Sequence, residues 1–149
     1  MTAHTHDLLD YAIDKEQEAH DFYVELADKM ERSVIRQVFK DFALEELRHK
    51  SKLQGIKTSG SAVKLAESIA DLKIGDYLVD VELTPELDYQ QALILAMKRE
   101  KAAFRLYYDL AVRAVDADLK ATLLVLAQEE AKHKLRFEIE YDEHYLTEN

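Results

Sequence analysis

An internal repeat restricts the possible folds of this chain more than any other sequence feature. A shift of 84 residues aligns Glu16 with Glu100 and holds without a gap through two long amphipathic patterns. The aligned positions carry apolar, acidic and imidazole side chains: Leu9/Leu93, Ala12/Ala96, Ala19/Ala103, Tyr23/Tyr107, Leu26/Leu110, Ala43/Ala127, Glu45/Glu129, Glu46/Glu130, His49/His133 and Lys50/Lys134. We therefore expect two copies of one structural unit, packed about a pseudo-twofold axis.

Each copy is expected to be a helix hairpin. The chain has only three Gly and one Pro in 149 residues, so long helices with few connections are favoured over strands. Apolar residues recur at helical spacing with charged residues between them. The sequence therefore predicts an all-α fold.

The predicted helices have boundary signals of their own. We expect Ser33 as an N-cap, Gly55 as a C-cap, and either Asp116 or Asp118 as the cap of the last helix. Thr84 followed by Pro85 indicates the start of the third helix. The expected helices are 5–30, 34–54, 84–114 and one from residue 116 or 118 to Tyr145.

The middle of the chain is too long for a tight turn. Residues 56–83 are expected to form a crossover along the bundle, with a short helix from Val63 to Leu72. Hairpins 5–55 and 84–146 would then form a single domain, 1–149, as a ferritin-like four-helix bundle. An up-and-down bundle with an elaborated middle loop is the alternative.

The repeat carries a set of potential metal ligands. In Glu46-x-x-His49 and Glu130-x-x-His133, the two side chains lie one turn apart on one helix face. Glu16 and Glu100 each lie 30 residues before the Glu of their own motif, on the partner helix. One Glu from each of two helices and a Glu-x-x-His from each of the others is the pattern of carboxylate di-metal bundles.

These residues can be given distinct roles. We expect Glu46 and Glu130 to bridge two ions, and Glu16 and Glu100 to be terminal ligands. Carboxylate and imidazole donors suit iron or manganese, whereas the absence of Cys weakens the case for structural zinc. Either Glu-x-x-His alone would more often be a surface pair, but two in one repeat register predict a site.

Several neighbouring residues have more than one interpretation. Tyr23 and Tyr107 are expected to hydrogen-bond the ligand carboxylates. Glu45 and Glu129 could orient an imidazole, although a solvated salt bridge is the favoured interpretation. His20, which aligns with Phe104, could be an extra ligand or proton donor, but a partly buried His is favoured.

Composition excludes several classes of function. A net charge of −10 without a basic cluster argues against nucleic-acid binding. The absence of Cys excludes disulfides, iron–sulfur clusters and thiol catalysis within the chain. There is no apolar stretch of transmembrane length, and Met1–Asp10 does not resemble a signal peptide, so a cytoplasmic location is expected.

The segments Glu16–Tyr23, Ala43–His49, Glu100–Tyr107 and Ala127–His133 resemble the di-iron, ferritin-like domain of the rubrerythrin family. The resemblance implies two iron ions, reduction of hydrogen peroxide or dioxygen, and a homodimer. The rubredoxin-like domain of rubrerythrins needs Cys ligands, so electrons are expected from an external donor protein. Where the family carries a further Glu one turn after the third-helix ligand, this chain has Ala103.

Three other functions stay open. The first is ferroxidase chemistry in iron handling, and the second is a metal-binding module without turnover. The third is a metal-free bundle that acts through protein contacts.

Overall fold

The structure is a computed structural model, and it describes residues 2–59, 72, 74–79, 84 and 86–146. Four long helices and no strands are present in these ranges. The helices are α1 (Thr2–Asp28), α2 (Ser33–Thr58), α4 (Tyr89–Arg113) and α5 (Ala117–Tyr141). A short 3-10 helix, η1 (Ile74–Tyr77), precedes α4, and a π-helical turn, η2 (Asp142–Leu146), follows α5.

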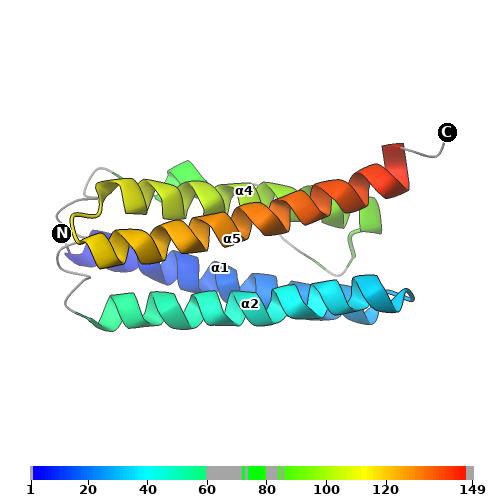
Figure 1. The fold of residues 1–149 in the computed structure, drawn as a ribbon, viewed down its shortest axis with the longest axis horizontal. Helices are drawn as coiled ribbons and strands as arrows, with labels where there is room; N and C mark the ends of the chain where they lie inside the picture. The colour runs from blue at the N-terminus through cyan, green and yellow to red at the C-terminus, as the bar shows by residue number, and fades with distance from the viewer. Residues whose placement is uncertain (1, 60–71, 73, 80–83, 85, 147–149) are drawn as a thin grey trace.

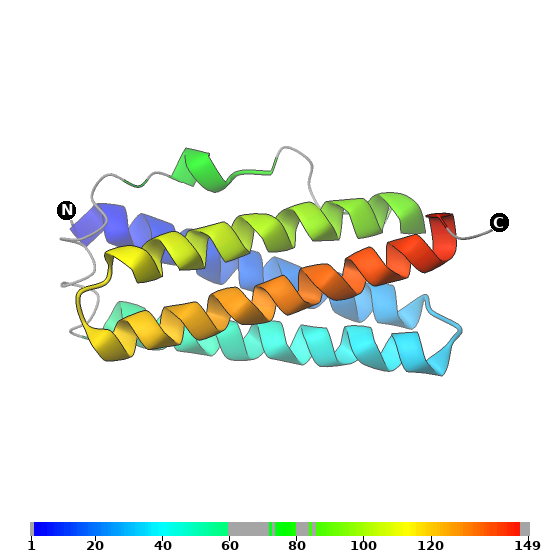
Figure 2. The ribbon, with the colours of Figure 1, turned by 45° about the horizontal axis from the view of Figure 1, so that its top comes forward.

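The helices form two antiparallel hairpins, α1 with α2 and α4 with α5 (Figure 1). In Figure 1, α2 (cyan) and α4 (green to yellow) run in the same direction, so the chain must return along the bundle between them. An up-and-down bundle is thereby excluded. The return passes η1, which contacts both α1 and α4 (Figure 2). Apart from Leu72, the short helix expected from Val63 to Leu72 lies outside the described residues.

The predicted caps of α2 were wrong. Arg32 is the N-cap and makes no side-chain cap bond, because Ser33 is already helical. The turn is instead held by the Arg36 guanidinium, which donates to the Met30 carbonyl from Nη2 at 2.7 Å and from Nε at 3.0 Å. The helix also continues past Gly55 to Thr58, because Ile56 extends its buried face.

The second hairpin begins later than expected. α4 starts at Tyr89 rather than at Thr84–Pro85, because Asp88 and Gln91 form a capping box. The Asp88 carboxylate accepts from the Gln91 N–H at 2.7 Å, and the Asp88 N–H donates to the Gln91 side chain at 3.1 Å. Asp116 is the N-cap of α5 and accepts from two backbone N–H groups, so the first of the two expected caps is the one used.

The buried apolar residues form two clusters at successive heights along the bundle. One contains Leu8, Leu53, Leu110 and Leu123, and the other contains Phe22, Phe39, Leu93 and Phe137, among others. Each cluster draws residues from both hairpins. The six potential metal ligands are buried between them, so the bundle interior consists of an apolar layer, a polar layer and a second apolar layer.

One buried carboxylate lies outside that polar layer. Glu140 accepts from the Tyr89 hydroxyl at 2.6 Å and from Arg32 Nη2 at 3.1 Å, both through Oε2. These contacts connect the end of α5 to the start of α4 and to the turn between α1 and α2. Among the described residues, no helix is long and apolar enough to cross a membrane.

Candidate metal centre

The bundle brings the six predicted ligands into one layer. α1 supplies Glu16 and α4 supplies Glu100, while α2 and α5 each supply a Glu and a His one turn apart. All six side chains belong to residues that are at most 2% exposed: Glu16, Glu46, His49, Glu100, Glu130 and His133. Charged residues are rarely buried to this extent unless they are paired or bind a metal.

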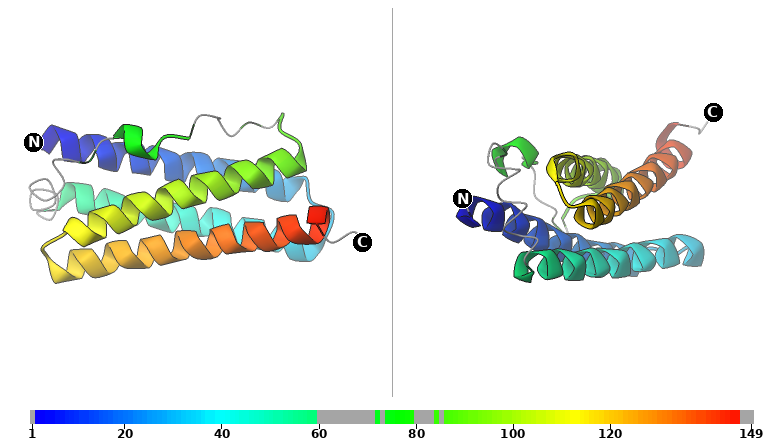
Figure 3. Two further views of the ribbon diagram at one scale, coloured as in Figure 1. Left: turned by 90° about the horizontal axis from the view of Figure 1, so that it is seen from above. Right: turned by 60° about the vertical axis from the view of Figure 1, so that its left-hand side comes forward.

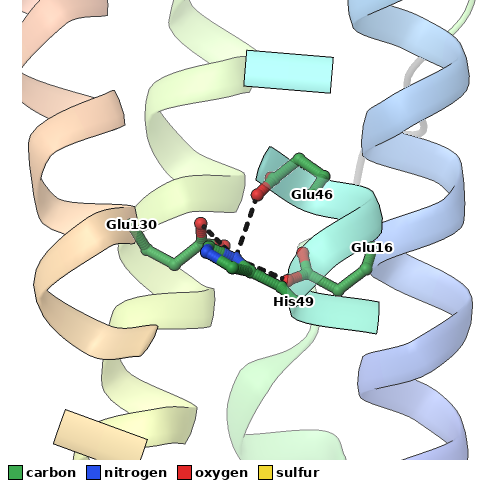
Figure 4. Close-up of side chains that lie close together, drawn as sticks. All are labelled: Glu16, Glu46, His49 and Glu130. Carbon is green, nitrogen blue, oxygen red and sulfur yellow. Dashed lines mark hydrogen bonds and ion pairs between the residues drawn. The ribbon is translucent and has the colours of Figure 1, made fainter. Parts of the chain in front are cut away.

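One half of the layer is centred on His49. Its Nδ1 atom lies 2.9 Å from Glu16 Oε2 and 3.2 Å from both Glu46 Oε1 and Glu130 Oε1. Figure 4 shows the three carboxylates converging on the imidazole from α1, α2 and α5. A single divalent ion could therefore take donors from both hairpins.

The other half repeats this arrangement around His133. Its Nδ1 atom lies 3.1 Å from Glu100 Oε2, 3.7 Å from Glu46 Oε1 and 3.6 Å from Glu130 Oε1. The two imidazoles are nearly parallel, with ring centroids 6.2 Å apart. Residues that are 84 positions apart in the sequence therefore make corresponding contacts in the two halves.

The six residues form two overlapping donor groups, each with ligand atoms within 4.8 Å of one another. The groups are Glu16, Glu46, His49 and Glu130, and Glu46, Glu100, Glu130 and His133. Glu46 and Glu130 occur in both, which is the arrangement needed for bridging two ions. All six residues of the two groups are positions of the repeat.

The hydrogen bonding of the two shared carboxylates tests whether they fit a metal. All four oxygens of Glu46 and Glu130 are buried and have no hydrogen-bond partner in the described part of the chain. An unpaired buried carboxylate is costly, whereas coordination to a cation would satisfy these oxygens. Four carboxylates and two imidazoles without thiolates suit iron or manganese.

Each imidazole is held from its far side by a carboxylate of the opposite hairpin. His49 Nε2 lies 2.6 Å from Glu129 Oε1, and His133 Nε2 lies 3.2 Å from Glu45 Oε1. The favoured expectation of solvated salt bridges was therefore wrong for both glutamates. A carboxylate at Nε2 places a ring proton there, so Nδ1, which faces the carboxylate layer, is the atom available to a metal ion.

Burial raises the pKa of the ligand carboxyls, and mutual repulsion adds to the effect. The pKa of Glu16 rises to about 8, through burial and then through the charge of Glu130. Burial and the neighbouring carboxylates raise the pKa of Glu46 well above its ordinary value and also raise that of Glu100. Without a cation, the layer therefore retains protons at neutral pH.

The pKa values of the two imidazoles are also raised. Burial alone would lower the pKa of His133, but hydrogen bonds to Glu100 and Glu45 outweigh it and raise the pKa to about 10. The pKa of His49 is also raised, because the carboxylates of Glu130, Glu16 and Glu46 beside its ring outweigh the effect of its burial. In the metal-free protein, protons thus neutralise the acids, as divalent ions would do in the metal-bound protein.

Two tyrosines extend the network across the hairpins. The Tyr23 hydroxyl donates to Glu100 Oε1 at 3.0 Å. Burial, nearby carboxylates and a hydrogen bond to Glu16 raise the pKa of Tyr107 well above its ordinary value. Both hydroxyls therefore stay protonated and can act as donors to the carboxylates that are expected to be terminal ligands.

The structure also shows where the repeat is broken. His20 Nδ1 lies 2.9 Å from the Ala43 carbonyl oxygen, and His20 belongs to neither donor group. Phe42 stacks on the His133 ring at 4.0 Å between centroids, whereas its repeat counterpart is Leu126. The two halves therefore differ in the packing around their imidazoles.

Comparison with known proteins agrees with this architecture. A sequence model of the rubrerythrin family matches residues 7–141. No curated protein sequence matches the chain. A solved structure of a hypothetical protein from Pyrococcus furiosus is 24% identical, covers 93% of this chain and 88% of its own, and has a TM-score of 0.69.

A second solved structure is that of a Thermotoga maritima protein, described as a candidate ferritin-like diiron-carboxylate protein. It is 22% identical, covers 93% of this chain and 95% of its own, and has a TM-score of 0.69. At this level of identity the likeness concerns the fold. The all-α, ferritin-like bundle predicted from the sequence is confirmed.

Proposed function

The chain belongs to the rubrerythrin family, and from this premise we propose that it binds two iron ions and reduces hydrogen peroxide or dioxygen. The observation that carries the proposal is the pair of donor groups that share Glu46 and Glu130. The Thermotoga maritima protein of the same fold is described as a candidate diiron-carboxylate protein, which supports iron as the metal.

The chain's own residues would hold the ions in a defined way. Glu46 and Glu130 would bridge them, Glu16 and His49 would complete one set of ligands, and Glu100 and His133 would complete the other. Two ferrous ions would supply one electron each for breaking the O–O bond of hydrogen peroxide, which with two protons gives two waters. The apolar layers above and below the ligands keep bulk water out.

Further residues would fix the ligands rather than contact the oxidant. Glu129 and Glu45 hold the two imidazoles by Nε2, so Nδ1 is the coordinating atom. The Tyr23 hydroxyl keeps its proton and donates it in a hydrogen bond to Glu100, which limits the orientations available to that carboxylate. Tyr107 is positioned to do the same for Glu16.

We also propose that electrons come from an external donor protein and that the chain forms a homodimer. The chain has no Cys with which to hold an iron–sulfur carrier of its own. Large apolar side chains lie exposed on the outer helix faces, among them Val112 at 53% and Leu135 at 55%. Sedimentation of the purified protein should give twice the mass of the 17.2 kDa chain.

The test of function begins with anaerobic loading of ferrous iron and measurement of its stoichiometry. The loaded protein is then mixed with hydrogen peroxide or with dioxygen in a stopped-flow instrument. We expect two irons per chain and rapid oxidation, and loss of both in Glu46→Ala and His133→Ala. Glu138→Ala, which removes a half-exposed carboxylate of α5, is the matched control and should behave as wild type.

The outcomes separate this function from its alternatives. Tight iron uptake without oxidation by either reagent would indicate a metal-binding module. Oxidation by dioxygen with release of ferric iron would indicate iron handling. Equal reactivity of wild type and the two ligand variants would contradict the proposal, and preferential loading with manganese or zinc would contradict the choice of iron.

A further inference from the structure

A small cavity is lined by residues of the two helices that carry Glu16 and Glu100. It lies between α1 and α4, under η1, and has a volume of about 30 Å³. All of its lining residues belong to these elements or directly follow η1, whereas both histidines belong to α2 and α5. Figure 3 shows η1 (green) along the seam between α1 and α4.

The inner wall of the cavity is one helical turn from the proposed ligands. Ala12 lies four residues before Glu16 on α1, and Ala103 lies three residues after Glu100 on the antiparallel α4. Tyr107, the proposed partner of Glu16, also lines the cavity. The small side chains of the two alanines leave the space beside this part of the ligand layer open.

The size of the cavity restricts what it can hold. A water molecule needs roughly 10–15 Å³ of such volume, so about 30 Å³ accommodates about two water-sized atoms. Hydrogen peroxide and dioxygen each have two heavy atoms and fit this volume. A branched hydroperoxide such as tert-butyl hydroperoxide does not fit.

A wider hollow at the surface neighbours the cavity. This outer hollow has a volume of about 390 Å³ and shares Tyr77, Val79 and Ala102 with the cavity. Its other lining side chains include Lys98, Lys101 and Arg105. The outer hollow and the cavity therefore border the same three residues, of which Tyr77 belongs to η1.

Tyr77, which lines both hollows, is held in place by hydrogen bonds. The Tyr77 hydroxyl donates to Asp109 Oδ2 of α4 at 2.8 Å. The Tyr77 carbonyl accepts from the Tyr11 hydroxyl of α1 at 3.2 Å. Because η1 is fixed to both helices, the size of the cavity is set by the packing of α1, α4 and η1.

The cavity wall also offers hydrogen-bond donors. Lys15 Nζ and Arg99 Nη2 both bind the Glu18 carboxylate, at 3.2 Å and 3.0 Å. Two cations share one anion there, so the wall keeps a net positive charge. Donors of this kind suit the oxygens of a peroxide and offer no attraction to a hydrocarbon group.

We propose that this cavity is the access route by which a two-oxygen oxidant reaches the metal centre, and that Ala103 sets its size limit. The inference rests on the proposed function and adds a selectivity to it. Hydrogen peroxide is admitted, whereas bulky alkyl hydroperoxides are excluded by the size of the cavity.

The test compares variants of Ala103 in the ferrous-loaded protein. Ala103→Leu fills the cavity, and we expect oxidation by hydrogen peroxide to slow at least tenfold. Ala103→Gly enlarges it, and the rate with tert-butyl hydroperoxide relative to hydrogen peroxide should rise at least threefold. Azide binding to the oxidised protein, followed by absorbance, gives a measurement that does not depend on turnover, and its association rate should fall at least tenfold in Ala103→Leu.

The repeat supplies a matched control. Ala19 is the counterpart of Ala103 and lies three residues after Glu16, but it packs in an apolar cluster and does not line the cavity. Ala19→Leu with full iron loading should retain the peroxide rate and the azide association rate. If Ala103→Leu does not load iron, Ala103→Gly still tests the size limit.

Different experimental results would overturn the access route and the proposed function. A wild-type protein that loads iron but does not react with hydrogen peroxide or dioxygen overturns the function. A reactive wild type whose peroxide rate and azide association rate are both unchanged in Ala103→Leu overturns the access route. An unchanged selectivity ratio in Ala103→Gly overturns the role of Ala103.

Discussion

Glu46 and Glu130 lie in an environment that no other pair of acids in the described structure shares. Each is fully buried and has both oxygens unpaired, and each faces both imidazoles. A protein interior tolerates such groups only when protons or cations compensate for them. The raised pKa values of the neighbouring acids show that protons take this role in the metal-free protein.

The metal-free protein should therefore lose stability as the pH rises. The carboxyl of Glu16 has an ordinary pKa of 4.5 and a folded-state pKa of about 8, so between these values only the folded state retains the proton. The raised pKa of His133, about 10 against 6.5, acts in the same direction at higher pH. Urea denaturation without metal should show the free energy of unfolding decreasing from pH 5 to pH 9.

Glu46→Gln is the informative variant for this prediction. It removes one buried acid whose pKa is raised, so the decrease between pH 5 and pH 9 should become smaller. A wild-type stability that increases with pH over this interval would show that the ligand layer is not protonated in the metal-free protein.

Glu45 and Glu129 should control metal affinity without being ligands. Each holds an imidazole of the opposite hairpin by Nε2, and loss of such a partner typically costs 10–100-fold in metal affinity. We expect a loss of about this size in Glu45→Gln and Glu129→Gln, measured by competition with a chelator for ferrous iron. Glu138→Gln, on the half-exposed surface of α5, should bind iron as wild type does.

The two hairpin turns are stabilised by different side-chain hydrogen bonds, although the hairpins are copies of one another. Asp116 caps α5 with its carboxylate, whereas Arg36 holds the corresponding turn before α2 by its guanidinium. The repeat aligns Asp116 with Arg32, whose side chain instead binds Glu140. The Arg32 side chain thus binds α5 and does not cap α2.

The caps of the second hairpin allow a prediction of local stability. Asp88→Ala and Asp116→Ala each remove a side chain that accepts helix N–H groups, so each should lower the free energy of unfolding by about 1 kcal/mol. Urea denaturation measures the change. Glu86→Ala, at an exposed position that makes no cap, is the control and should differ from wild type by less than about 0.5 kcal/mol.

At the scale of the whole molecule, the backbone contacts are concentrated within the hairpins rather than between them. The two hairpins meet through large side chains of the apolar clusters and through the ligand layer. Two ions bound there would connect all four helices, because each helix supplies at least one ligand. Metal should therefore act mainly on the association of the hairpins.

Iron loading should accordingly raise the melting temperature, and its removal should lower it. A ligand at 100 times its Kd stabilises the folded state by about 2.7 kcal/mol, and about 2–4 °C per kcal/mol is typical at this size. We expect a shift of about 5–10 °C by anaerobic calorimetry, reversed by a chelator. The shift should be absent in Glu46→Ala, and its persistence there would place the stabilising iron elsewhere.

Much of this architecture follows from local periodicity. The spacing of apolar residues determines helices with one inward face, and the three-residue spacing of Glu and His places both side chains on that face. Because the repeat carries the same residues in both halves, the sequence also indicates that the six side chains face one another. The helix starts were less predictable. Ser33 and Pro85 are typical of helix starts, but the observed starts are determined by the contacts of Arg36 before α2 and by the Asp88 capping box before α4.

Only the tertiary structure decided which imidazole Glu45 and Glu129 each bind, how Glu140 is buried and where a cavity lies relative to the ligands. These features join residues far apart in the sequence, such as Glu45 with His133 and Arg32 with Glu140. They depend on the rotation and separation of the packed hairpins, which the pattern of a single helix does not contain. The sequence by itself determined the inward faces and their potential ligands, and the packing of the hairpins determined how these residues meet.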